Sequence, residues 1–174
     1  MTSFVVLGDA GVGKTAFMYR AIHGAVPLNI FTLTKIRRFC WRGALQSSSA
    51  SFAVVPGAAT DSEIGHALDG ADGVIVMYRD DLQTARRWLC RAARAVHNMQ
   101  SVPLMVVCIG AQSQGRLAPL LRAFPSAEHA AVTSVTGAQD CINRIVHRAR
   151  RSPPSPLEMR TGRATALLPG TAEA

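Results

Sequence analysis

The residues best suited to chemistry in this 174-residue chain lie near its start, in the run Gly8–Thr15. This run, Gly-Asp-Ala-Gly-Val-Gly-Lys-Thr, has the P-loop spacing G-x-x-x-x-G-K-[ST], in which backbone N–H groups cradle phosphate. Lys14 would reach the outer phosphates of a nucleoside triphosphate, and the Thr15 hydroxyl would bind Mg²⁺. The predicted phosphate-binding residues, which we call the glycine loop, are Gly8, Asp9, Ala10, Gly11, Val12, Gly13, Lys14 and Thr15.

The elements around the glycine loop fit the context that this motif requires. Phe4–Leu7 predicts a buried strand before it, and Thr15–His23 predicts a helix after it. Further strands are predicted over 36–41, 51–55, 74–78, 104–109 and 130–133, and further helices over 61–69, 82–96, 117–124 and 139–151. This alternation predicts an α/β fold with a mostly parallel central sheet and helices on both faces. Ligands in such sheets bind at the carboxyl ends of the strands.

Composition limits the size of the fold and the kind of partner. Hydrophobic residues make up 48% of the chain, which is enough for one domain, predicted over residues 1–151. Residues 152–174 are rich in proline, small residues and arginine, and we expect a disordered tail. The net charge of +8 favours acidic partners, such as nucleotide phosphates, nucleic acid, anionic membranes or acidic proteins, without choosing among them. A basic, solvated surface is the plain alternative.

Several other functions find little support in the sequence. The four cysteines have no zinc-binding spacing, and buried thiols in a reducing compartment are the simplest interpretation. The first residues do not have the pattern of a signal peptide, and no apolar stretch is long enough to span a membrane. The last residues contain no cysteine for a lipid anchor. No RNA-recognition motif accompanies the arginines. We therefore expect a cytoplasmic protein without sequence-specific binding to nucleic acid.

The glycine loop resembles that of the Ras superfamily, especially the Rab-like small GTPases. The order and lengths of the predicted elements are similar to those of a small G domain, and the resemblance covers most of residues 3–151. Val102–Val107 resembles the strand that leads to the guanine-reading loop, and Thr133–Gly137 looks like the last base-contacting loop. The resemblance implies a P-loop NTPase fold that binds GTP or another nucleoside triphosphate with Mg²⁺. It also implies a protein effector or regulator as partner.

The chain departs from the family where magnesium and the attacking water are held. The family has Asp-x-x-Gly at the end of its second apolar strand, and the aligned residues here are Val54–Gly57. Gly57 is retained and would contact the γ-phosphate, but Val54 replaces the carboxylate that holds Mg²⁺. Ala58 replaces the glutamine that orients the attacking water. A threonine that meets Mg²⁺ is expected at Thr34, with Thr32 as the alternative.

The residues that would read the base also differ from the family. Its Asn-Lys-x-Asp motif aligns with Ala111–Gln114, which lacks the carboxylate that binds guanine. Losing that charge-assisted hydrogen bond costs about 1.5–3 kcal/mol, or about ten- to a hundredfold in affinity. Gln112, Gln114 and Ser134 remain as candidate base contacts, with no clear preference for guanine or adenine.

These departures predict a small-GTPase-like protein that binds nucleotide weakly, hydrolyses it slowly or not at all, and works as a regulatory protein-interaction module. Two alternatives stay open, a slow but genuine GTPase switch and a nucleotide-free pseudo-GTPase scaffold. The segment Lys35–Arg42 is basic and aromatic, whereas comparable effector-binding segments of the family are often acidic. A partner bound there should therefore differ in charge, unless the segment is only an edge strand kept soluble by charge.

Overall fold

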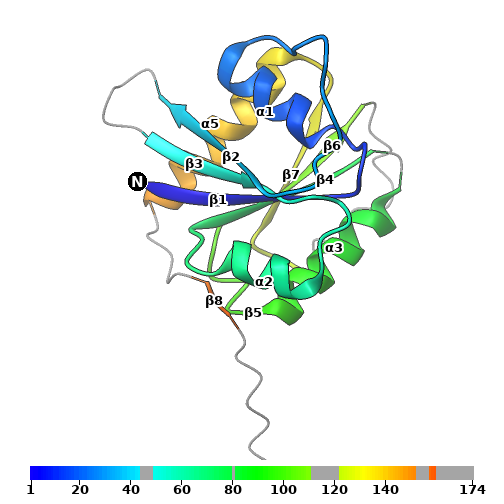
Figure 1. Ribbon diagram of the computed structural model, residues 1–174. Coiled ribbons are helices and arrows are strands. Elements are labelled where there is room, and N and C mark those ends of the chain that lie inside the picture. Colours follow the sequence, from blue (N-terminus) through cyan, green and yellow to red (C-terminus); the bar gives the residue numbers. More distant parts are fainter. Residues whose placement is uncertain (44–48, 80, 111–121, 152–156, 160–174) are drawn as a thin grey trace, which may run out of the picture.

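A six-stranded sheet forms the centre of the computed structural model, which describes residues 1–43, 49–79, 81–110, 122–151 and 157–159 (Figure 1). The strand order is β2-β3-β1-β4-β6-β7. The bounds are β1 Thr2–Leu7, β2 Arg37–Arg42, β3 Ser49–Val54, β4 Gly73–Tyr78, β6 Leu104–Ile109 and β7 Ala127–Val132. Edge strand β2 runs antiparallel to β3, and the other neighbours are parallel. The predicted α/β class with a mostly parallel sheet is confirmed.

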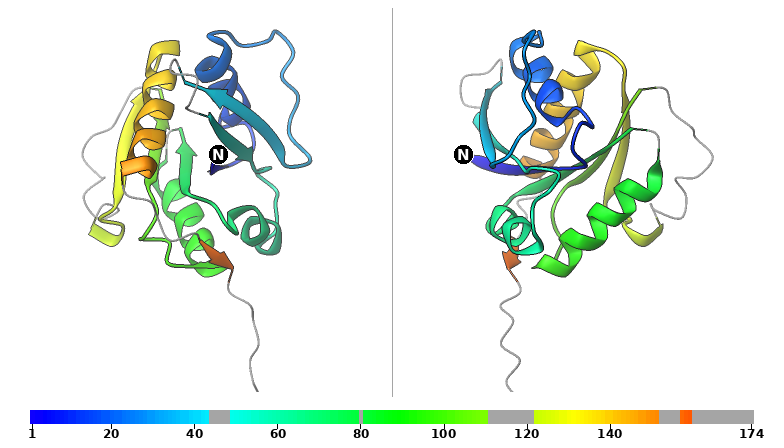
Figure 2. Two further views of the ribbon diagram at one scale, coloured as in Figure 1. Left: turned by 90° about the vertical axis from the view of Figure 1, so that its left-hand side faces the viewer. Right: turned by 45° about the vertical axis from the view of Figure 1, so that its right-hand side comes forward.

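Helices cover both faces of the sheet (Figures 1 and 2). The helix α1 (Lys14–His23) and α5 (Val135–Arg151) lie on one face, and α2 (Asp61–Leu68) and α3 (Leu82–Ala95) lie on the other. The apolar core is accordingly divided into two buried clusters, one on each side of the sheet. In the part of the chain that the structure describes, no helix is both long and apolar enough to cross a membrane.

Most predicted elements are found, with shifted ends. The strand predicted from Phe4 begins at Thr2, and the strand predicted from Ala130 begins at Ala127. The helix α5 begins at Val135, four residues before the predicted start, because Ser134 caps it: its Oγ accepts from the N–H of Gly137 at 3.1 Å. The helix predicted over 117–124 lies mostly outside the described residues.

The sequence predicts that the domain ends at Arg151, but the folded part of the chain extends beyond that residue. A two-residue strand, β8 (Glu158–Met159), pairs antiparallel with β5 (Val96–His97). Just before it, Leu157 is 1% exposed within the core cluster on the side of the sheet that α2 and α3 cover. The N–H of Gly70 donates to the Leu157 carbonyl at 2.8 Å. Residues 157–159 therefore belong to the folded domain, and the predicted boundary after Arg151 is too early.

Replacing Leu157 with alanine should lower the free energy of unfolding by about 2–4 kcal/mol, because the change leaves a cavity in a closed part of the core. Urea denaturation followed by circular dichroism measures the loss. Leu28→Ala is the matched control, since Leu28 is fully exposed and its truncation should cost less than about 0.5 kcal/mol. Equal effects of the two changes would show that Leu157 is not part of the core.

Candidate phosphate-binding site

The glycine loop connects the carboxyl end of β1 to the first turn of α1. Gly8, Gly11 and Gly13 have φ values of 147°, 74° and 103°, a region that side chains rarely adopt. Gly13 caps α1 without a side-chain hydrogen bond, and the first turn contains no acidic residue. The partial positive charge of the helix N-terminus is therefore not offset by an acidic side chain in that turn, as an anion-binding site requires.

A cavity of about 270 Å³ opens at this end of the sheet. Three segments build it: the glycine loop with the start of α1, the loop before β2, and the turn after β3. Among the described residues its walls are Ala10, Gly11, Gly13, Lys14, Thr15, Ala16, Ile30, Phe31, Thr32, Leu33 and Gly57. Lys14 and Thr15 are only 6% and 7% exposed, so the charge and the hydroxyl predicted to meet phosphate are both held inside the structure.

The ammonium group of Lys14 is held by the loop itself. Its Nζ donates to the carbonyl of Gly8 at 2.5 Å and to that of Asp9 at 2.8 Å. Burial lowers the pKa of Lys14 from 10.5 to about 8, and the negative charge of Asp9 opposes this effect. An anion in the cavity would favour the charged form and raise the pKa again.

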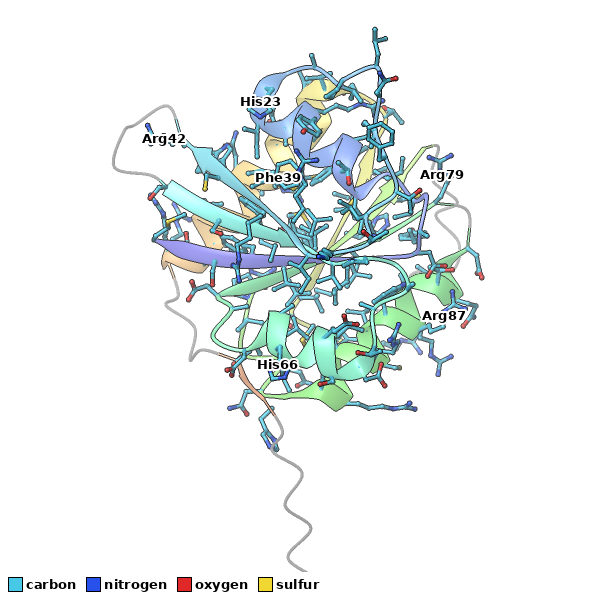
Figure 3. All side chains as sticks on the ribbon, viewed as in Figure 1. His23, Phe39, Arg42, His66, Arg79 and Arg87 are labelled. Atoms are coloured by element: carbon cyan, nitrogen blue, oxygen red, sulfur yellow. The ribbon has the colours of Figure 1, made fainter. Side chains whose placement is uncertain are left out.

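The side chain of Asp9 is bound by α3. Its Oδ1 accepts from Trp88 Nε1 at 2.7 Å, and its Oδ2 accepts from Arg87 at 2.9 Å. Figure 3 labels Arg87 on α3. Asp9, a predicted site residue, therefore hydrogen-bonds Lys14 only through its backbone carbonyl. Sequence reasoning missed Trp88, although it lies between Ala85 and Leu89 on the apolar face of α3 and is 1% exposed. Helical spacing could have placed it in the core, but not against Asp9.

Gly57 lies directly against the glycine loop. A Cβ atom added to it would stand 2.1 Å from the backbone N of Ala10 and 2.7 Å from the carbonyl carbon of Asp9. No side chain fits at these distances. Val54, which aligns with the family's magnesium-binding aspartate, is fully buried in the apolar cluster on the α1 side of the sheet. Ala58 is exposed and carries no group that could orient water.

The other predicted site residues are only partly brought together. Thr32 lines the cavity with Lys14, whereas Thr34 lines a neighbouring cavity of about 450 Å³ that also contains Thr15 and Thr32. Ser134 caps α5, as described above. Gln112 and Gln114 lie outside the described residues.

The oxygen atoms that the described cavity wall offers as metal ligands do not suit a divalent cation held by the protein. The predicted magnesium ligands supply only hydroxyl oxygens, from Thr15 and either threonine of the loop, while Mg²⁺ in proteins is usually bound through one or two carboxylates together with substrate phosphates. In the described ranges, no group of three or more His, Cys, Asp and Glu side chains could hold a metal ion. The site suits an anion better than a cation.

Comparison with models of known protein families and with curated proteins gave no match.

Proposed function

We propose that this chain is a divergent, small-GTPase-like P-loop protein that binds a nucleoside triphosphate, GTP or a close analogue, with slow or no hydrolysis. The observation that carries the proposal is the cavity at the carboxyl end of β1, where Lys14, Thr15 and the N-terminus of α1 lie together. Backbone N–H groups, a lysine and a helix N-terminus bind phosphate in this arrangement. The resemblance of the glycine loop to that of the Rab-like GTPases supports GTP as the first ligand to test.

Slow hydrolysis follows from the groups around the cavity. Phosphoryl transfer depends on positioning the attacking water and on neutralising charge in the transition state. Ala58 cannot orient water, and Val54 cannot hold a metal ion. Losing one such stabilising group costs about 10²–10³ in rate. Binding depends on other groups, namely the glycine loop and Lys14, and should be retained.

Equilibrium binding and single-turnover hydrolysis test the proposal. We expect fluorescent N-methylanthraniloyl GTP and the matching ATP analogue to bind with affinities within about tenfold of each other, because no guanine-reading carboxylate aligns with the family motif. Lys14→Ala should weaken binding of both about a hundredfold or more. Turnover at a rate typical of intact small GTPases, abolished by Lys14→Ala, would instead support a genuine GTPase switch.

One observation favours the scaffold alternative. The ammonium group of Lys14 already donates hydrogen bonds to the carbonyls of Gly8 and Asp9, so it has partners within the glycine loop when no ligand is bound. A scaffold would bind neither analogue, with or without the lysine. The same binding measurement therefore separates the three functions.

Affinity for phosphate should fall as the pH rises above about 8. Lys14 binds the anion in its charged form, and its pKa in the ligand-free protein is about 8. Below that pH the lysine is charged and contributes fully to the affinity. Above it, each pH unit should weaken binding about tenfold until the raised pKa of the complex is reached. Titration calorimetry with inorganic tripolyphosphate between pH 7 and 9.5 measures the slope. A flat profile would mean that Lys14 does not titrate in the site.

We propose that the regulatory partner binds the loop before β2 and the edge of β2. Leu28 and Phe31 are 103% and 83% exposed there, and Lys35, Arg37 and Arg38 are exposed beside them. Apolar anchors flanked by positive charge suit an acidic protein surface. Because Phe31 also lines the cavity, nucleotide in the cavity would alter this surface. We also propose that the protein works in a reducing compartment such as the cytoplasm, where its four cysteines stay free thiols.

Nucleotide should slow tryptic cleavage after Lys35, Arg37 and Arg38. Residues 30–33 line the cavity, so a bound triphosphate would contact this loop and restrain it. Mass spectrometry of timed digests with and without GTP measures the effect at each bond. In Lys14→Met, cleavage at the same bonds should not respond to GTP. Equal protection of the variant would show that GTP acts elsewhere.

A further inference from the structure

Among the residues that the structure describes, the wall of the cavity contains no acidic side chain. Between Asp9 and Asp61 the sequence has no Asp or Glu, while it contains the basic residues Lys14, Arg20, Lys35, Arg37, Arg38 and Arg42. This stretch includes most of the glycine loop, α1, the loop before β2, both strands β2 and β3, and the turn at Gly57. Every described residue in the cavity wall comes from it. The described wall therefore carries the positive charge of Lys14 and no carboxylate.

The acidic residues at the two ends of this stretch are bound elsewhere. The Asp9 carboxylate accepts from Trp88 and Arg87 of α3. Asp61 accepts from Arg91 Nε at 2.6 Å, in an ion pair that attaches the start of α2 to α3. Neither carboxylate is part of the described cavity wall.

Two further acidic residues cap helices. Glu63 belongs to the capping box of α2 and accepts from the backbone N–H of Thr60 at 2.7 Å. Asp81 lies on the other side of the glycine loop, where it caps α3 and accepts from the N–H of Gln83 at 2.9 Å. Supplying a carboxylate to a cation in the cavity would break one of these caps or ion pairs.

We propose that the cavity binds the phosphate groups of its ligand without a divalent cation, with Lys14 and the N-terminus of α1 as the counter-charge. This inference rests on the proposed function and specifies the ligand as the metal-free triphosphate. Magnesium removes two negative charges from a triphosphate. In a site with acidic ligands, the cation is attracted by both protein and nucleotide, and chelation weakens binding. Here the cavity offers positive charge only, so the more negative, metal-free form is bound at least as well.

Binding of N-methylanthraniloyl GTP in Mg²⁺ and in excess EDTA tests the inference. Chelation should leave the dissociation constant unchanged or lower it, and inorganic tripolyphosphate should compete equally well in both buffers. A dissociation constant that rises more than about threefold in EDTA overturns the inference and leaves the proposed function intact. No binding in either buffer refutes the proposed function, and the inference with it.

A gain-of-function variant tests the cause. Thr32 is exposed and lines the cavity, so Thr32→Asp adds a carboxylate there without disturbing the core. Its dissociation constant should rise about tenfold or more in EDTA, because only Mg²⁺ relieves the repulsion between the new carboxylate and the phosphates. Thr32→Asn has the same shape as Thr32→Asp without the charge, and its dissociation constants in Mg²⁺ and in EDTA should differ by less than about threefold. A Thr32→Asp variant that binds alike in both buffers would show that the missing carboxylate is not the determinant, and would overturn the inference.

Discussion

Replacing Lys14 with methionine should weaken binding of the GTP analogue about a hundredfold and at the same time raise the stability of the ligand-free protein. The loss of affinity follows from removing a charge-assisted contact to phosphate worth up to about 3 kcal/mol. The gain has a separate cause. Burial lowers the pKa of Lys14 from 10.5 to about 8, which corresponds to about 3 kcal/mol against the charged form. Methionine has similar length and needs no hydration.

The gain should be smaller than that limit, because Lys14 also gives up hydrogen bonds to Gly8 and Asp9. We expect about 1–2 kcal/mol at pH 7, or a melting temperature raised by a few degrees. The advantage should disappear toward pH 10.5, since the lysine of the unchanged protein then folds uncharged and its stability rises between about pH 8 and 10.5. Scanning calorimetry at pH 7 and pH 10 measures both effects.

Arg94→Met is the matched control, because it removes the same charge from an exposed position on α3. It should change neither the stability nor the affinity appreciably. If Lys14→Met destabilised the ligand-free protein, the lysine would be a structural anchor of the loop and the cavity would not be held ready for an anion.

Gly57→Ala should be the most damaging single-methyl change in this region. Its Cβ would lie 2.1 Å from the backbone N of Ala10, and the atoms it meets belong to backbone that cannot rotate away. The turn after β3 or the glycine loop must therefore move, and either movement deforms the cavity. Overpacking of this kind costs about 1–3 kcal/mol or more. We expect that loss in urea denaturation, together with at least a tenfold loss of affinity for the GTP analogue.

The neighbouring residue provides the comparison. Ala58 is exposed, and Ala58→Ser adds one atom without a contact to the glycine loop, so stability and affinity should stay unchanged. If Gly57→Ala bound nucleotide as tightly as the unchanged protein, the turn would be free to move away and Gly57 would play no part in shaping the cavity.

Contiguous parts of the fold and site were predictable from the sequence. The glycine loop is one run of eight residues, and its strand and helix follow from apolar spacing on either side. The cavity wall contributed by Gly57 was predictable only through the resemblance to small GTPases. That Lys14 donates to two carbonyls of its own loop was not predictable, because the motif specifies the residue types and not the ligand-free arrangement.

Long-range contacts account for most of what the sequence did not reveal. Asp9 and Trp88 are separated by 79 positions, and no periodicity links them. The segment before β8 follows a proline- and serine-rich run and gives too short a pattern to recognise, although Leu157 is fully packed. The early start of α5 was missed because Gly137 lowers the helical propensity of its first turn, whereas the Ser134 cap compensates for it.

The contact between Trp88 and Asp9 gives the protein an internal optical probe. The indole of Trp88 is buried, and its N–H is bonded to a residue of the glycine loop. The chain has only one other tryptophan, Trp41, which lies partly exposed on β2. In a Trp41→Phe background, the tryptophan emission of the protein therefore comes from a single indole beside the site, when it is excited at a wavelength that tyrosine does not absorb. Movement of the loop around a ligand can then be followed without any label.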